Sequence, residues 1–241
     1  MDGAAAVLKI ASDAHEVRGG KLLAWWEGDG AAKVYASSAN AFVIERAEGT
    51  RSLMTMALQG FDDMASTVAC STVSRLHAHK SPSGETPELV SLQSWFTELT
   101  AVSHDSRILQ ICANQAIKLL SAQQDMTVLH GDIHHDNILD FAERGWLAID
   151  PKGLYGERGY DYANLIVNPD LHTVANPARF DRQVRVVSEQ AGLNSQRLLA
   201  WVLAVSGLSA LWFMQDGDIQ HASQDLAVAR MAAQSLSINP D

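Results

Sequence analysis

The segment VLHGDIHHDNILDF, residues 128–141, holds the side chains best suited to chemistry: three histidines, three aspartates and one asparagine between apolar residues. Within it, Asp132 precedes Asn137 by five positions, and His130 stands two residues before Asp132. A carboxylate can accept the proton of an attacking hydroxyl, and an amide oxygen can hold a magnesium ion without adding negative charge. This pair therefore suits phosphoryl transfer.

A phosphoryl-transfer site needs further groups, and the sequence supplies them. The spacing of His130, Asp132 and Asn137 matches the H-x-D-x-x-x-x-N pattern of a kinase catalytic loop. A second magnesium ligand is expected at the end of a following strand, and WLAIDPKG places Asp150 there. Upstream, Lys9 in a predicted strand could reach nucleotide phosphates, and Glu16 in the next helix could hold that lysine in place.

The segment also allows two other interpretations. His130 and His134 are four residues apart, as two zinc ligands on one helix would be, but Gly131 and the flanking strand patterns argue against a helix. The aspartates and Asn137 could also simply form turns. We favour the turn interpretation for His134, His135 and Asp136, and the catalytic interpretation for the residues of the spaced motif.

The apolar pattern predicts how the chain positions these groups. Residues 4–10 indicate a strand, and residues 15–28 have apolar residues at helical spacing. The runs at 31–36 and 40–47, divided by turn-forming residues, indicate an antiparallel hairpin. Short apolar runs at 127–130, 137–141 and 146–150 indicate strands, so the polar residues between the first two runs are expected in a loop. Helices are predicted at residues 60–79, 88–101, 105–124, 160–167, 179–192, 193–214 and 218–236.

Composition narrows the class of protein. The 241 residues are 47% hydrophobic and 19% charged, which is typical of a soluble globular protein of one domain or two lobes. The net charge of −10 disfavours nucleic acid and favours a cationic small molecule as partner. Only Cys70 and Cys112 are present, no signal peptide is recognised, and we expect no membrane-spanning stretch. These features predict a cytoplasmic protein.

The stretches LHGDIHHDNIL and GWLAIDPKGLYGERGYDYANL resemble the aminoglycoside phosphotransferase family, and most closely its streptomycin 6-phosphotransferase group of aminoglycoside/hydroxyurea resistance kinases. The resemblance implies an α+β, protein-kinase-like fold of two lobes. Residues 1–47 would form a partial N-lobe with an abbreviated sheet, and residues 48–241 a mainly helical C-lobe. The activity implied is phosphorylation of an aminoglycoside hydroxyl, with streptomycin as the expected acceptor, dependent on ATP and Mg²⁺.

The same resemblance assigns roles to individual residues. Asp132 would be the catalytic base, and Asn137 and Asp150 the magnesium ligands. Lys9 would contact the phosphates with Glu16 as its partner. Adenine would meet the backbone near Glu45, Arg46 and Ala47, and Asp161 would brace the catalytic loop. We expect Glu157, Asp161 and Asp170 to be ordinary surface or structural acids, with no part in binding the substrate.

One departure concerns the N-terminus. The family has two strands and a phosphate-covering loop before the lysine strand, and no Gly-rich loop precedes Lys9 here. Loss of this hairpin would remove phosphate donors and expose a sheet edge to self-association. We therefore expect that ATP binds weakly, that a partner subunit supplies the missing part, or that the N-terminus is truncated or its start misassigned. Besides an active enzyme, the sequence therefore allows a kinase-like binding module with impaired catalysis, or a kinase of another small hydroxylated metabolite.

Overall fold

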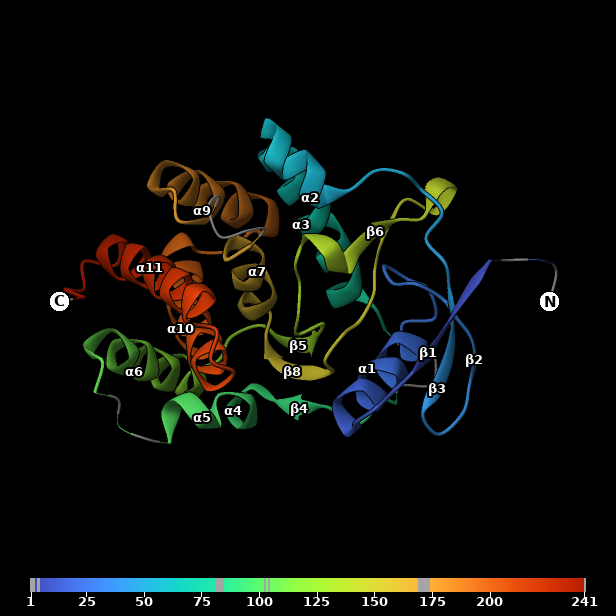
Figure 1. Ribbon diagram of the computed structural model, residues 1–241, viewed down its shortest axis with the longest axis horizontal. Helices are drawn as coiled ribbons and strands as arrows, with labels where there is room; N and C mark the ends of the chain where they lie inside the picture. The colour runs from blue at the N-terminus through green and yellow to red at the C-terminus, as the bar shows by residue number, and fades with distance from the viewer. Residues whose placement is uncertain are drawn as a thin grey trace. The chain divides into compact units, whose positions relative to one another are not determined.

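The computed structural model describes residues 3, 5–80, 85–101, 103, 105–168 and 174–240. This part of the chain combines short strands with many helices (Figure 1). The strands are β1 (Ala6–Ile10), β2 (Val34–Ser37), β3 (Ala41–Glu45), β4 (Val90–Ser91), β5 (Met126–Leu129), β6 (Ile138–Asp140), β7 (Trp146–Ala148) and β8 (Leu154–Glu157). The α-helices are α1 (Ala14–Trp25), α2 (Leu53–Met56), α3 (Asp62–Ala78), α4 (Leu92–Trp95), α5 (Thr97–Thr100), α6 (Arg107–Ser121), α7 (Gly159–Ile166), α9 (Pro177–Ala191), α10 (Ser195–Gln215) and α11 (Ile219–Ser235). A π-helical segment, η1 (Ala57–Phe61), joins α2 to α3, and η2 (His135–Asn137) and η3 (Ala142–Arg144) are 3₁₀ turns.

The residues form two compact units. The first contains Met1–Val90 and Thr127–Tyr155, and the second contains Ser91–Met126 and Gly156–Asp241. The lysine strand β1 and the polar segment at 128–141 therefore belong to the same unit. Each unit is defined by the contacts within it, so the units do not test the lobe boundary expected after residue 47. That boundary stays a prediction.

The N-terminal sheet of the first unit has the order β1-β3-β2 and is antiparallel, with Ala6 opposite Glu45 and Ile10 opposite Ala41. The predicted hairpin is present as β2 and β3. β1 is an edge strand, and the side chains of Val7, Leu8 and Ile10 are 49–66% exposed. Apolar edge strands can pair with other chains. The self-association expected through this edge stays a prediction.

Helix α1 packs closely on this sheet. It begins at the N-cap Asp13, whose carboxylate accepts hydrogen bonds from the backbone N–H groups of His15 and Glu16. Gly20 faces the ring of Phe42, and a Cβ at that position would lie 2.4 Å from ring carbons. Only glycine allows the helix to approach β3 so closely, and this fixes α1 beside the lysine strand.

The segment after β3 is attached to β6. Arg51 makes a bidentate ion pair with the buried Asp140, with Nε–Oδ2 and Nη2–Oδ1 distances of 2.8 and 2.9 Å. The Arg51 guanidinium lowers the pKa of Asp140 to about 2. At Gly49, a Cβ would lie 2.1 Å from the Asp140 carboxyl carbon. These contacts hold the connection between β3 and α2 against the strand that follows the polar loop.

The predicted helix at 60–79 begins earlier in the structure. The helical run starts after Ser52, whose hydroxyl accepts a hydrogen bond from Thr55 N–H, and continues through η1 into α3. Gly60 has φ of 92°, so the run is kinked there. The sequence predicted a helix only from residue 60 onward, because Gly60 interrupts the apolar spacing.

In the second unit, α10 is the central helix, and α6, α7, α9 and α11 pack on it (Figure 1). Helix boundaries follow the sequence signals: Asn176 caps α9 with Pro177 in its first turn, Asn194 caps α10, and Gly192 ends α9 with φ of 60°. Trp201 is fully buried and packs against Phe96, with ring centroids 6.0 Å apart. This aromatic residue of α10 is thus part of the core.

Helix α10 corrects one expectation. Among the described residues, Ser195–Gln215 is long and apolar enough to cross a membrane, although we expected no such stretch. In the folded chain, 67% of the most apolar stretch of this helix is buried. Burial of this kind is found in core helices, which pass the same test of length and hydropathy.

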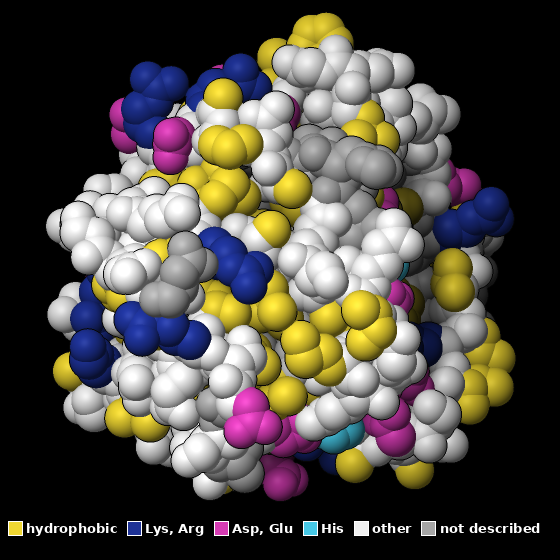
Figure 2. Space-filling view, turned by 60° about the vertical axis from the view of Figure 1, so that its left-hand side comes forward, with side chains coloured by type: hydrophobic (Ala, Val, Ile, Leu, Met, Phe, Trp, Pro, Cys, Tyr) yellow, Lys and Arg dark blue, Asp and Glu magenta, His cyan; other side chains and the backbone are white. Residues whose placement is uncertain are grey.

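The charged side chains of one face are mixed in sign (Figure 2), and both cysteines are buried. On the face shown in Figure 2, basic and acidic side chains occur in small groups, some of them side by side, so the net charge of −10 does not produce a uniformly acidic surface there. Cys70 and Cys112 are both free and buried, and burial raises the pKa of each thiol to about 12. Neither cysteine is therefore a reactive thiolate at neutral pH.

Asp225 on α11 predicts a pH-dependent stability. Burial raises its pKa to about 6, although Ser209 and His221 oppose the shift, and its Oδ2 atom has no hydrogen-bond partner among the described residues. The unfolded chain ionises this carboxyl near pH 4, so each rise in pH from about 4 to about 6 favours unfolding. We expect Asp225→Asn to raise the free energy of unfolding by about 1–3 kcal/mol at pH 7.5.

The gain from Asp225→Asn should disappear below about pH 4, where wild type is also neutral at this position. Urea denaturation at about pH 3.5, 5.5 and 7.5 measures it. Asp216→Asn, at the exposed end of α10, is the control and should show no such trend. An equal effect of Asp225→Asn at all three pH values would contradict the raised pKa.

Candidate active site

The polar loop between β5 and β6 is held by its own histidine. His130 is fully buried, its Nε2 lies 2.7 Å from the carbonyl oxygen of Ile149, and its Nδ1 accepts a hydrogen bond from Asp132 N–H at 3.2 Å. This pattern requires the proton on Nε2. Among the described residues, no group of three or more His, Cys, Asp and Glu side chains could hold a metal ion. His130 is therefore a structural residue here, and the zinc interpretation has no support.

Gly131 gives the loop its sharp turn. Its φ is 89°, and a Cβ there would lie 2.8 Å from Leu154 Cγ and 3.1 Å from Lys152 Cβ. Both the left-handed backbone and the close packing require glycine. The next residue, Asp132, is consequently directed out of the turn, and its side chain remains 36% exposed.

Asn137 is oriented by two hydrogen bonds. Its side-chain nitrogen donates to the carbonyl oxygen of Asp132 at 2.8 Å, and its backbone carbonyl oxygen accepts from Ile149 N–H at 2.9 Å. The amide nitrogen is thus occupied, which leaves the side-chain oxygen as the group available to a cation. The second bond also places Asn137 beside the strand end that leads to Asp150.

Asp150 follows β7 with a positive φ of 55°, a conformation that costs energy in a residue other than glycine and is common at functional sites. Its carboxylate Oδ1 lies 2.7 Å from Lys9 Nζ. Helix α1 supports the next residue, because a Cβ on Gly19 would lie 2.0 Å from the carbonyl oxygen of Pro151. The structure thus brings together Lys9 and Asp150, which are 141 positions apart in sequence.

Glu16 has a different partner from the one expected. Its carboxylate accepts hydrogen bonds from the backbone N–H and the hydroxyl of Ser12, at 2.6 and 3.1 Å, so it reaches back over the N-terminus of α1. Within the described ranges, Lys9 pairs with Asp150 and forms no ion pair with Glu16. A Lys9–Glu16 pairing in the nucleotide-bound chain stays a prediction.

The residues expected to meet adenine lie at the end of β3 and just after it. The side chain of Glu45 accepts from Lys33 N–H at 3.1 Å and pairs with Arg144, and Arg46 N–H donates to Ala5 at 3.2 Å. Ala47 N–H has no backbone hydrogen-bond partner in the part of the chain described here. A backbone donor is therefore available at Ala47, whereas the groups of Glu45 and Arg46 named above are already engaged.

One charged residue beside the candidate site was not singled out from the sequence. Lys152, in the IDPKG stretch, places Nζ 3.1 Å from Asp132 Oδ2. Its backbone N–H also donates to His130 at 2.7 Å. The lysine stands two positions after Asp150, but sequence spacing alone does not indicate which carboxylate its side chain would reach.

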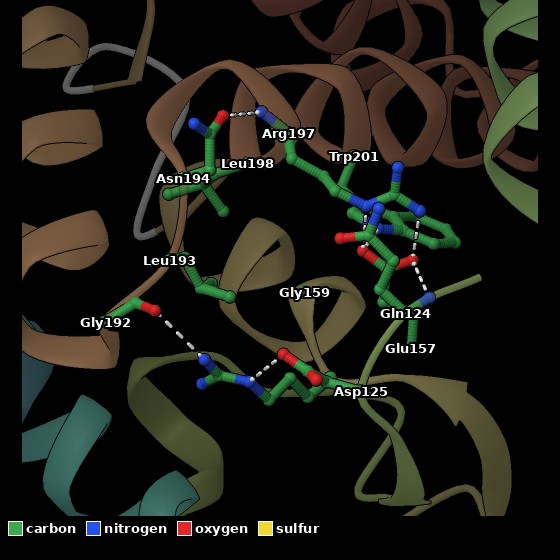
Figure 3. A pocket seen from close by; sticks show the side chains of 11 residues that line it. Gln124, Asp125, Glu157, Gly159, Gly192, Leu193, Asn194, Arg197, Leu198 and Trp201 are labelled. Atoms are coloured by element: carbon green, nitrogen blue, oxygen red, sulfur yellow. Dashed lines mark hydrogen bonds and ion pairs between the residues drawn. The ribbon is translucent and has the colours of Figure 1, made fainter. Parts of the chain in front are cut away.

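A separate pocket of about 70 Å³ in the second unit contains none of the predicted site residues (Figure 3). Its charged groups pair with one another: Arg197 with Glu157, and Arg158 with Asp125. Glu157 is buried, as expected for a structural acid. Asp161 is also buried, and Asp170 lies outside the described residues.

The first unit's donor set fits magnesium and a nucleotide. Asn137 offers a neutral oxygen and Asp150 a carboxylate, from neighbouring strand ends, and Mg²⁺ commonly takes one or two protein oxygens and fills its remaining positions with water and phosphate. Lys9, already at the Asp150 carboxylate, is the nearby cation for phosphate. These residues could therefore hold Mg²⁺ and ATP.

Comparisons with known proteins identify the family of this chain. Residues 1–217 match the family model of aminoglycoside/hydroxyurea antibiotic resistance kinases. A streptomycin 3''-kinase of Klebsiella pneumoniae is 45% identical over 238 residues, covering 96% of this chain and 89% of that protein. A streptomycin 6-kinase of Streptomyces griseus is 28% identical over 256 residues, covering 96% and 78%.

Solved structures confirm the expected protein-kinase-like α+β fold. Aminoglycoside phosphotransferase APH(4)-Ia in a ternary complex with ADP and hygromycin B superposes with a TM-score of 0.69 at 14% identity, covering 98% of this chain and 88% of that one. A choline/ethanolamine kinase family protein of Mesorhizobium loti gives 0.67 at 14% identity, covering 95% and 83%. By its sequence match, this chain belongs to the aminoglycoside/hydroxyurea antibiotic resistance kinase family.

Proposed function

We propose that the chain transfers the γ-phosphoryl group of ATP to a hydroxyl of streptomycin, with magnesium, in the cytoplasm. The arrangement that supports this most directly is the loop in which Asp132 and Asn137 are joined by a hydrogen bond and lie beside the strand end carrying Asp150. The similarity to streptomycin kinases supports the acceptor, and the ADP complex of APH(4)-Ia supports the nucleotide.

The reaction follows from the charges in the loop. The substrate hydroxyl oxygen forms a bond to the γ-phosphorus, the bond to the β–γ bridging oxygen breaks, and ADP leaves with that electron pair. Asp132 orients the hydroxyl and accepts its proton. Magnesium on Asn137 and Asp150 would neutralise the phosphate charge. Lys9 exchanges its present partner, Asp150, for a phosphate oxygen.

We further propose the 3''-hydroxyl as the position phosphorylated. The chain is 45% identical to a streptomycin 3''-kinase, against 28% and 27% for two streptomycin 6-kinases, at similar coverage of this chain. The family resemblance in the catalytic stretches does not separate the two positions, since Asp132, Asn137 and Asp150 act on any hydroxyl brought to them. The acceptor position depends on how the substrate is held.

The test is to incubate the purified chain with ATP, Mg²⁺ and streptomycin, and to locate phosphate on the product by phosphorus–proton correlation NMR. We expect a single monophosphate at the 3'' position. Hydroxyurea and other aminoglycosides form the comparison panel, because a hydroxyurea phosphotransferase is also 28% identical. Phosphate at position 6 would refute the regiochemistry alone. No transfer to any acceptor by the folded chain would favour the kinase-like binding module.

A further inference from the structure

Lys152 forms an ion pair with Asp132, the proposed catalytic base. Its Nζ lies 3.1 Å from Asp132 Oδ2, and the side chains of the two residues are 42% and 36% exposed. Lys9 makes a corresponding pair with Asp150 at 2.7 Å. Each of the two carboxylates proposed for the reaction therefore has its own lysine, and the proposed reaction uses only Lys9 of the two.

The backbone of Lys152 is fixed against the loop, so its side chain is not a freely placed surface lysine. Its N–H donates to the carbonyl oxygen of His130 at 2.7 Å. A Cβ placed on Gly131 would lie 3.1 Å from the Cβ of Lys152. His130 in turn accepts the N–H of Asp132 at 3.2 Å. Lys152 and Asp132 are thus positioned through one shared residue.

The charges at the site favour movement of the Lys152 ammonium away from Asp132. A half-exposed ion pair contributes little to stability, so the ammonium can leave Asp132 at small cost. During transfer, negative phosphoryl oxygens approach the hydroxyl that Asp132 holds. A lysine has three donors on a flexible stem, and here it starts within hydrogen-bond distance of that carboxylate. The phosphoryl oxygens therefore come within reach of Lys152.

We propose that Lys152 is a catalytic residue: its ammonium moves from Asp132 to an oxygen of the γ-phosphoryl group and stabilises it during transfer. This rests on the proposed kinase function. The alternative is that Lys152 only positions Asp132, in which case it never contacts the nucleotide. The two roles differ in what they predict for ATP against ADP, because only ATP carries the γ-phosphoryl group.

Nucleotide binding separates the roles without relying on turnover. We expect Lys152→Met to weaken Mg-ATP binding about tenfold by calorimetry and to leave Mg-ADP binding unchanged. Lys21→Met, an exposed lysine on α1 without an ion pair to the described residues, is the matched control and should change neither. Equal affinities of wild type and Lys152→Met for both nucleotides would overturn the proposal, even if the wild type phosphorylates no acceptor.

Turnover gives the second test. We expect Lys152→Met to lower kcat about 100-fold, and Lys152→Arg, which keeps the charge, to lower it less. In the Asp132→Asn background, Lys152→Met should still reduce the residual rate. If its effect vanishes in that background, Lys152 acts only through Asp132 and the proposal is wrong. Absence of turnover in wild type would instead contradict the kinase function, and the nucleotide affinities would still decide the role of Lys152.

Discussion

Asp132→Asn is expected to reduce phosphoryl transfer to streptomycin by about 10³-fold or more in kcat. The amide keeps the size and shape of the carboxylate but cannot accept the hydroxyl proton, and it replaces a negative group with a neutral one beside the attacking oxygen. ADP release in a coupled assay measures kcat directly, and the streptomycin phosphate formed confirms that the release reports transfer.

The fold should tolerate this change. The Asp132 side chain is 36% exposed and pairs with Lys152, and the bond that fixes Asn137 uses the backbone carbonyl of Asp132, which the substitution keeps. Melting temperatures of mutant and wild type should therefore agree closely. Asp136→Asn, an exposed aspartate in the same loop, is the matched control and should retain full activity. Asp132→Asn with wild-type kcat would remove Asp132 from the mechanism.

The proximity of Asp132, Asn137 and Asp150 could be predicted from sequence because their arrangement is local, whereas their roles stay predictions. Asp132 and Asn137 lie on one loop, and the five-residue separation lets the Asn137 amide bond to the Asp132 carbonyl within that turn. Asp150 follows the strand that pairs with the one after the loop, with Ile138 opposite Ala148, so a β-hairpin returns it to the loop. Short chain connections of this kind constrain where side chains can go.

Contacts over long sequence separations were not predictable. The pairing of Lys9 with Asp150 depends on how α1 and β1 pack on the IDPKG stretch, and no periodicity encodes that. Glu16 was expected to reach Lys9, but its carboxylate accepts hydrogen bonds from the backbone N–H and the hydroxyl of Ser12, just before α1. An acid in the first turn of a helix can cap that helix or pair with a side chain on a neighbouring strand. The sequence does not distinguish these two roles.

The short strand β8 was also missed. Leu154–Glu157 lies between β4 and β5 in a sheet of order β4-β8-β5, and its neighbour β4 has two residues. Strands this short do not establish an alternating pattern. The missed strand β8 ends at Glu157, the acid for which we expected a surface or structural role and not a part in substrate binding.

Glu157 is the centre of a buried network in the second unit. Its two oxygens accept hydrogen bonds from Arg197 Nε and Nη2, both at 2.6 Å, from Trp201 Nε1 at 2.7 Å and from Gln124 N–H at 2.9 Å (Figure 3). The pKa of Arg197 is raised chiefly by its hydrogen bond to Glu157. The carboxylate therefore links α10 to the end of β8 and to the segment after α6.

Glu157→Ala should lower the free energy of unfolding by about 3–5 kcal/mol, because it leaves the Arg197 charge and two N–H donors without their acceptor. Glu157→Gln keeps an acceptor oxygen and should cost less. Urea denaturation followed by tryptophan fluorescence measures both. Glu189→Ala, an exposed acid on α9, is the control and should stay within about 0.5 kcal/mol of wild type. If Glu157→Ala costs no more than Glu189→Ala, water entering the adjacent pocket has replaced the carboxylate, and the network does not stabilise the helical unit.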